Sequence, residues 1–390
     1  MVTKFIIFDG YVEGITNILD IFETQLQPDY QPESFNNGID RMLAILNTSG
    51  TTGKPKAVTI SSSRKIFDPY RYLCQNDVQY AATPLNWVSG LVALITSGVY
   101  GTLRIISKEA FSATSFLTLC GEYKITWTVV ATPYIAMIAN SKEVNAKQLS
   151  SLKYILYAGD RSLTGTLQKM QSYLQCEGIL HQVYGMTELG CGATYNFGSQ
   201  SKLSSVGLIQ RNIRMRIVSE SGQALGPNER GEIHCHLGQH WGGYFGNALA
   251  RSEVQDSDGW IHTGDLGYFD DDNYLYIVGR KSEFLRFAME MYYPREIEEV
   301  IAQMPEISEV CVFGIWNEID GDAAAASVVA KAGCQLTANQ VLEFVAENIS
   351  ENYKQLHAGV QIVSNLAKNL NGKVNRQAVK EEFLKATGQI

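Results

Sequence analysis

Short apolar runs of strand length alternate with longer segments of helical periodicity in the first part of the chain. The strand-like runs fall at residues 4–9, 42–46, 79–84, 102–107 and 126–133. Apolar positions recur at helical spacing in residues 14–26, 89–101 and 115–123. This alternation is typical of parallel strands connected by crossover helices, so we expect an α/β fold with a mostly parallel sheet.

The pattern changes twice along the rest of the chain. Residues 205–237 alternate apolar and polar positions around turn signals, which predicts an antiparallel β-roll. After Arg280 the pattern predicts helices over 294–304, 338–349 and 375–386 and strands over 309–315 and 359–364. We therefore expect a large N-terminal domain, residues 1–279, and a small α+β C-terminal domain, residues 280–390, with the boundary at Gly279.

Composition narrows the class of protein. At about 150 residues per domain, 390 residues suggest two or three domains. The net charge of -8 argues against nonspecific binding to nucleic acid or to an anionic membrane. No stretch approaches the roughly 18 apolar residues of a membrane span, and the apolar run at 5–8 is too short for a secretory signal. Seven scattered cysteines without a CxxC pair disfavour a disulfide framework or structural zinc site, so we expect an intracellular protein.

Residues 46–58, LNTSGTTGKPKAV, concentrate hydrogen-bond donors and hold no carboxylate. Around Gly50 and Gly53 stand four hydroxyls and two lysines: Thr48, Ser49, Thr51, Thr52, Lys54 and Lys56. Glycines let backbone N–H groups approach phosphate oxygens, and lysine neutralises their charge. A Walker A loop is excluded, because Gly50 and Gly53 are only three apart and Lys54 precedes a proline. An anion-binding loop and an ordinary Ser/Gly-rich turn both stay open on this segment alone.

Three later segments add nucleotide chemistry. Residues 182–190, QVYGMTELG, include Tyr184, which can stack on a base, Thr187, which can donate to a phosphate, and Glu188, which can hold a metal. The alternatives are that Tyr184 only fills the core and that Glu188 is a surface acid. Downstream, Asp265 follows a glycine and precedes Arg280, a suitable acceptor and donor for a ribose. Lys373 stands beside Gly372 in a loop near the C-terminus.

These four segments, in this order, resemble the adenylate-forming superfamily of acyl-CoA synthetases, nonribosomal adenylation domains and beetle luciferases. The resemblance runs from about Lys4 to the C-terminus. The sequence pattern is most similar to that of the insect luciferase-like and 4-coumarate-CoA ligase-like branch. It implies a large N-terminal domain and a small mobile C-terminal domain joined by a hinge at Gly279. It also implies ATP, Mg²⁺ and coenzyme A as cofactors and a small carboxylic acid as the substrate, a fatty acid foremost and an aryl acid second. Cytoplasmic or peroxisomal location is the family tendency, although residues 388–390 are not an SKL-type signal.

The resemblance also implies roles for single residues. Thr48, Ser49, Gly50, Thr51, Thr52 and Lys56 would hold the β- and γ-phosphates. Thr187 would contact the α-phosphate, Glu188 would bind Mg²⁺, and Tyr184 would stack on adenine beside Gly159. Asp265 and Arg280 would bind the ribose. Lys373 would bridge the acyl carboxylate and the α-phosphate.

Several positions depart from the family pattern. Asn86 and Trp87 stand where luciferases show paired histidines, which disfavours luciferin chemistry. Near Arg286, which offers a positive charge, Ala288 and Met289 replace a basic residue and glycine, so Met289 threatens thioester formation. The chain also begins where family members are already well into their large domain.

A histidine-rich stretch presents an alternative chemistry. His234 and His236 share one face of a predicted strand, with Cys235 opposite and His240 beyond, a spacing that suggests zinc. An ordinary β-roll strand leading into a turn at Gly243 is the interpretation we favour.

Together these features predict an AMP-forming acyl-CoA ligase. Two alternatives stay open: a truncated, non-catalytic relative that acts as a binding or interaction protein, and an enzyme that stops at the acyl-adenylate.

Overall fold

The fold is described from a computed structural model. It describes residues 6–7, 16–17, 42–48, 56–61, 73–159, 164–174, 178–196, 202, 204–238, 241–288, 290–368 and 372–389. The chain divides into two compact units, Met1–Ile39 and Asp40–Ile390.

The first unit contains a parallel pair of short strands, β1 (Ile6–Ile7) and β2 (Thr16–Asn17). The helix predicted over 14–26 is therefore wrong at Thr16–Asn17. Position 16 is a threonine, a β-branched residue type that favours extended backbone over helix.

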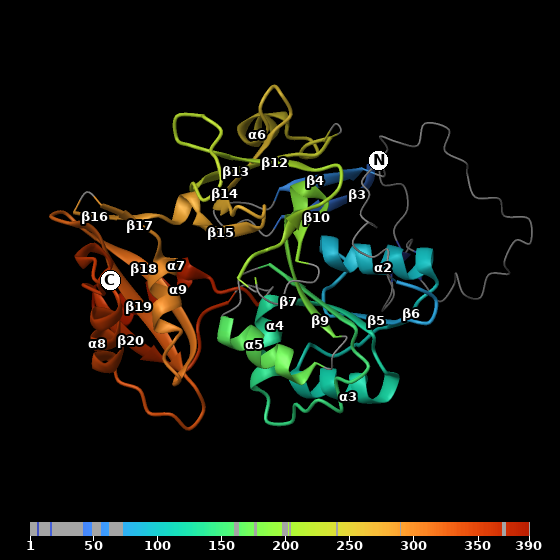
Figure 1. The fold of residues 1–390 in the computed structure, drawn as a ribbon, viewed down its shortest axis with the longest axis horizontal. Coiled ribbons are helices and arrows are strands. Elements are labelled where there is room, and N and C mark those ends of the chain that lie inside the picture. Colours follow the sequence, from blue (N-terminus) through green and yellow to red (C-terminus); the bar gives the residue numbers. More distant parts are fainter. Residues whose placement is uncertain are drawn as a thin grey trace, which may run out of the picture. The chain divides into compact units, whose positions relative to one another are not determined.

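The second unit is built around a seven-stranded sheet of order β11-β10-β9-β8-β7-β5-β6 (Figure 1). Its strands are β5 (Val78–Ala81), β6 (Leu103–Ile105), β7 (Trp127–Ala131), β8 (Tyr154–Ala158), β9 (Ile179–Met186), β10 (Cys191–Tyr195) and β11 (Leu208–Ile209). Strands β5 to β9 run parallel, whereas β10 and β11 join antiparallel. The expectation of a mostly parallel sheet is confirmed.

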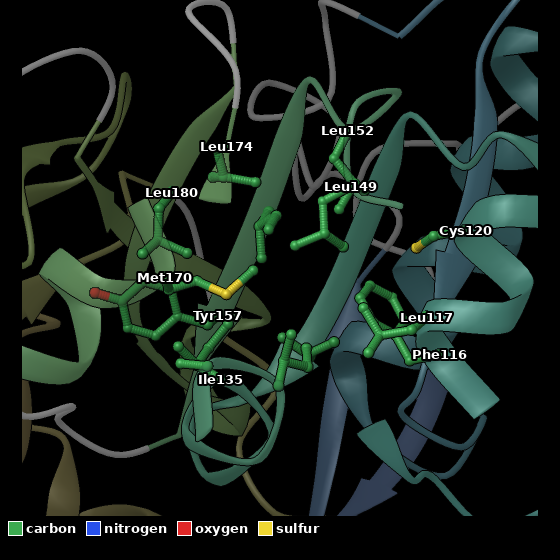
Figure 2. Packing of buried hydrophobic residues seen from close by; sticks show 14 of the residues in the cluster. Phe116, Leu117, Cys120, Ile135, Leu149, Leu152, Tyr157, Met170, Leu174 and Leu180 are labelled. Atoms are coloured by element: carbon green, nitrogen blue, oxygen red, sulfur yellow. The ribbon is translucent and has the colours of Figure 1, made fainter. Parts of the chain in front are cut away.

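Helices cover both faces of this sheet: α2 (Val88–Tyr100) on one, and α3 (Ala113–Tyr123), α4 (Thr132–Asn140) and α5 (Thr164–Tyr173) on the other (Figure 1). Successive strand residues point to opposite faces. Trp127 and Val129 of β7 accordingly pack with Val92 of α2. Val130 packs with the other three helices, whose Phe116, Leu117, Ile135 and Met170 gather on the sheet (Figure 2).

A four-stranded antiparallel sheet forms the predicted β-roll. Its order is β12 (Arg214–Val218), β13 (Gly231–His236), β14 (Ile261–Phe269) and β15 (Leu275–Arg280), with α6 (Ala248–Val254) between β13 and β14. The roll extends beyond the predicted end at residue 237. Gly279 lies within β15, where it pairs with Leu266, and the domain boundary placed there stays a prediction.

A hairpin of β3 (Met42–Asn47) and β4 (Ala57–Ser61) attaches to the chain beyond β13. The Thr59 amide donates to the Gly243 carbonyl at 3.0 Å, and the Phe245 amide donates to the Ala57 carbonyl at 2.7 Å. These bonds bring the segment that carries Lys56 beside Tyr244.

The C-terminal part holds a five-stranded sheet in which β17-β16-β19-β18 are neighbours and β20 pairs with β19. The elements are β16 (Leu285–Phe287), β17 (Glu290–Tyr292), α7 (Pro294–Ile301), β18 (Ile307–Asn317), β19 (Gly321–Ala330), α8 (Ala338–Asn348), β20 (Gly359–Val363) and α9 (Arg376–Ala386). The predicted helices and strands are confirmed, and β16, β17 and β19 are added to them.

We expect Ala324→Leu to lower the free energy of unfolding by about 1–3 kcal/mol, because β19 is buried on both faces and extra methylenes overpack the core. Ala324 and Ala326 face α7 and α8, whereas Ala325 faces α9, and all three are fully buried. Urea unfolding measures the change. The control Ala386→Leu, at the exposed end of α9, should stay within about 0.5 kcal/mol. An equal loss in both variants would contradict tight packing around β19.

Candidate functional site

The centre of the candidate site is Asp265, a buried carboxylate on β14. Asp265 lies directly opposite Arg280 on the neighbouring strand, and the guanidinium Nε is 2.8 Å from the carboxylate Oδ1. The Tyr184 hydroxyl, at the end of β9, donates to the other carboxylate oxygen at 2.8 Å. Asp265 is only 7% exposed. Three strands from two sheets thus meet at one buried charge.

Burial raises the pKa of Asp265 above its ordinary value, while Arg280, Tyr184 and Lys373 act against this rise. Burial, with the nearby Asp265 charge, also raises the pKa of the Tyr184 hydroxyl. Tyr184 therefore keeps its proton and serves as a donor.

A second buried carboxylate, Glu188, lies in a short 3-10 helix, Thr187–Leu189, that follows β9 directly. The Tyr244 hydroxyl donates to Glu188 Oε1 at 2.8 Å. The Lys56 ammonium lies 5.0 Å from the centre of the Tyr244 ring, within the range of a cation–π contact. Lys56 is also 3.7 Å from Glu253, a largely exposed partner that contributes little.

Only the two ends of the donor-rich loop are described. The Thr48 amide donates to the Lys56 carbonyl at 2.9 Å, and the Lys56 amide donates to the Thr48 hydroxyl at 3.1 Å. These bonds close the loop between two antiparallel strands. The predicted residues Ser49, Gly50, Thr51 and Thr52 lie outside the described residues.

Lys373 is brought to the end of β8. A Cβ added to Gly159 would stand 3.3 Å from Lys373 Cε. Gly159 also has a φ of 105°, a value that residues with a Cβ rarely adopt. Lys373 also acts electrostatically on Asp265. The C-terminal lysine therefore shares one site with Gly159 and Asp265, although more than a hundred residues separate it from either in sequence.

Arg286 lies apart from these contacts. It is an exposed residue of β16 whose amide donates to Asp322 Oδ2 at 3.3 Å. In the turn that follows, Ala288 has a φ of 48°, an unusual value for a residue with a Cβ. Met289 lies outside the described residues.

Sequence reasoning assigned no role to Tyr244. The pattern predicts only a turn at Gly243, yet the Tyr244 hydroxyl donates to Glu188 and its ring makes a cation–π contact with Lys56. An aromatic residue placed after a glycine is a weak signal, because turns of this composition are common on protein surfaces.

Comparison with known families decides the identity. The sequence model of the AMP-binding enzyme family matches residues 12–245, and that of the AMP-binding enzyme C-terminal domain matches residues 296–373. The chain belongs to the AMP-binding enzyme family. The resemblance to adenylate-forming enzymes is thereby confirmed.

Individual proteins are similar to this chain over most of its length. 4-Coumarate–CoA ligase 3 of Oryza sativa subsp. japonica is 29% identical over 385 residues, 95% of this chain and 68% of the relative. Luciferin 4-monooxygenase of Nipponoluciola cruciata is 28% identical over 392 residues, 95% of this chain and 70% of the relative. The solved structure of o-succinylbenzoate coenzyme A synthetase from Bacillus subtilis with ATP and magnesium ion has a TM-score of 0.78 at 26% identity, covering 94% of this chain and 75% of that one.

Of the helices in the described ranges, none combines the length and the apolar character needed to cross a bilayer.

Tyr184→Phe should lower the free energy of unfolding by about 1.5–3 kcal/mol, because Asp265 loses a hydrogen bond to a charged acceptor in a buried site. The matched control is Tyr157→Phe, a buried tyrosine whose hydroxyl donates at 3.3 Å to the neutral side chain of Gln182. Its loss should be only about 0.5–1.5 kcal/mol. Urea unfolding at pH 7 compares them, and a larger loss for Tyr157→Phe would contradict the importance of Asp265.

Proposed function

We propose that the chain is an ATP-dependent acid–thiol ligase. The carboxylate of an aryl or fatty acid attacks the α-phosphorus of ATP, which forms acyl-AMP and releases pyrophosphate. The thiol of coenzyme A then attacks the acyl carbon, and AMP leaves. The observation that carries the proposal is the meeting of Lys373 with Gly159 and Asp265 in a chain of the AMP-binding enzyme family.

The ribose and adenine would bind around Asp265. A carboxylate has about four acceptor positions, and Arg280 and Tyr184 each use one, which leaves acceptor capacity for the ribose hydroxyls. Charge-assisted bonds of this kind contribute roughly 1.5–3 kcal/mol each. Arg280 would hold Asp265 in place, and the Tyr184 ring would stack on adenine beside Gly159.

The phosphates would bind around Glu188 and the donor-rich loop. Mg²⁺ prefers one or two carboxylate ligands together with phosphate oxygens, and a buried Glu188 oriented by Tyr244 fits this preference. When bound, the ion would neutralise charge on the triphosphate. Thr187 would donate to the α-phosphate. Residues of the loop would donate to the β- and γ-phosphates: Thr48, Ser49, Gly50, Thr51, Thr52 and Lys56.

Lys373 would act on the reacting atoms. Its ammonium would lie between the acyl carboxylate and the α-phosphate, where negative charges must approach one another and further charge develops. A domain rotation at the boundary between residues 279 and 280 would then withdraw Lys373 and admit coenzyme A, with Arg286 attracting its phosphates.

Two observations bear on the acid. 4-Coumarate and o-succinylbenzoate, the acids in the names of similar proteins, are both carboxylic acids that carry an aromatic ring, which supports an aromatic acid. A fatty acid stays part of the proposal, since one methylene changes selectivity by only about 1–3 kcal/mol.

The decisive experiment measures pyrophosphate release by the purified chain with Mg-ATP and a panel of aryl and fatty acids, with and without coenzyme A. We expect acid-dependent release, and acyl-CoA when coenzyme A is present. Release without acyl-CoA would favour an adenylate-only enzyme. Absence of release and of ATP binding in a folded sample would favour a non-catalytic binding protein.

Lys373→Ala should lower the rate of adenylation about 10²–10³-fold, as removal of a preorganised charge at the reacting centre does. Thioester formation from preformed acyl-AMP should fall much less. The matched control is Lys368→Ala in the same loop, because Lys368 pairs with Glu309 at the surface (2.7 Å). Both half-reactions are measured by rapid quench, and equal loss in both for Lys373→Ala would refute the assigned role.

A further inference from the structure

A cluster of metal-binding side chains lies on the β-roll. His234 on β13 and His262 on β14 are directly opposite in the strand register, and their rings stack with centroids 3.9 Å apart at 10°. Glu232, two residues before His234, lies on the same face of its strand. Its Oε2 is 3.8 Å from His234 Nε2. Each of the three side chains offers one ligand atom within 4.8 Å of the others.

Burial makes His234 unusual within this cluster. The residue is only 5% exposed, and among the described residues its Nδ1 finds no hydrogen-bond partner. A buried polar atom without a partner is rare in folded proteins, and an ion bound at the group is one of the accepted reasons for it.

We propose that Glu232, His234 and His262 bind a divalent transition metal ion, with Zn²⁺ as the best fit. Two imidazoles and one carboxylate form a common three-residue ligand set for zinc, and water completes the tetrahedron. Bonds of about 2.0–2.1 Å to zinc place tetrahedral ligands roughly 3.4 Å apart. The ligand atoms of the three residues lie within 4.8 Å of one another, so they would have to move closer together, and the stacked rings would have to rotate until both lone pairs point at the ion.

Asp256 lies beside His262, one of the proposed metal ligands. Its Oδ2 is 3.5 Å from His262 Nε2, so the carboxylate can hold the ring nitrogen that does not bind the metal. Zinc-bound histidines commonly have such a partner, which fixes the tautomer and the ring orientation.

Two cations compete for these carboxylates. Lys281 Nζ is 2.7 Å from Glu232 Oε2, and the Arg216 guanidinium is 3.5 Å from Asp256. The Lys281 side chain is 56% exposed. It can turn into solvent, and the ion would then replace it as the cation beside Glu232, whose side chain is only 13% exposed. Metal binding would thus release Lys281 from Glu232.

The proposed ligands differ from those the sequence suggested. The His236 Nδ1 accepts the Gly238 amide at 2.9 Å, and its ring packs edge-to-face on Trp260. The contacts of His236 thus stabilise the end of β13. His240 lies outside the described residues. His262, 28 residues after His234, takes the second position.

The test is calorimetric titration of Zn²⁺ into the tag-free, chelator-stripped chain, with excess Mg²⁺ and without ATP or acid. We expect one Zn²⁺ per chain and a higher midpoint of thermal unfolding, because the ion binds the folded state. His262→Gln and Glu232→Gln should each weaken binding at least tenfold. His236→Gln, on the same strand, should leave it unchanged, and circular dichroism confirms that each variant folds.

Cobalt substitution excludes binding to the free cysteines. Co²⁺ held by two imidazoles and a carboxylate shows ligand-field bands without a thiolate charge-transfer band. Binding below one ion per chain, equal affinity in His262→Gln, or a thiolate band would overturn the proposal. Because ATP and acid are absent, each of these outcomes is independent of whether the chain is a ligase.

Discussion

A carboxylate taken out of water must be paired, and the candidate site is organised by this requirement at Asp265. Arg280 and Tyr184 supply the pairing from β15 and β9, and Lys373 adds charge from the C-terminal loop. Because these partners come from three parts of the chain and meet at one buried carboxylate, the β-roll, the large sheet and the C-terminal loop are energetically linked there. Glu188 repeats the arrangement on a smaller scale, with Tyr244 as its donor. Tyrosine suits both positions because its hydroxyl donates while its ring fills apolar space.

The topology places these groups at one edge of the large sheet. Strands β8 and β9 are parallel neighbours, so Gly159 and Thr187, which follow them directly, emerge at the same end. Ligands of open α/β sheets bind outside the carboxyl ends of the strands. Strand β9 is also where the strand direction changes, because it is parallel to β8 and antiparallel to β10. The nucleotide roles proposed for this edge thus follow a general property of such sheets.

Sequence patterns predicted most of this arrangement and missed identifiable parts of it. Asp265, Arg280 and Tyr184 were named as ribose and adenine ligands, but a pattern cannot show that they bind one another across two sheets. Strand β19 escaped notice because its run of alanines lacks the large residues that mark a strand, and alanine favours helices when isolated. Residues 14–26 carried helical spacing, yet Thr16–Asn17 pair as a strand. The partnership of His234 with His262 required strand register, which only the folded sheet supplies.

The attachment of β4 to Gly243 has a consequence for biosynthesis. The Thr59 hydroxyl donates at 2.8 Å to a carbonyl 184 residues later, and Leu46, Val58 and Ile60 are covered by a cluster that includes Tyr244. At 5–20 residues per second, a ribosome needs roughly 10–40 s to add that length of chain. The apolar side chains of the hairpin therefore stay exposed to solvent until the later segments that cover them have been synthesised. The nascent chain is consequently exposed to chaperones and to aggregation at this hairpin, the segment that later closes the donor-rich loop.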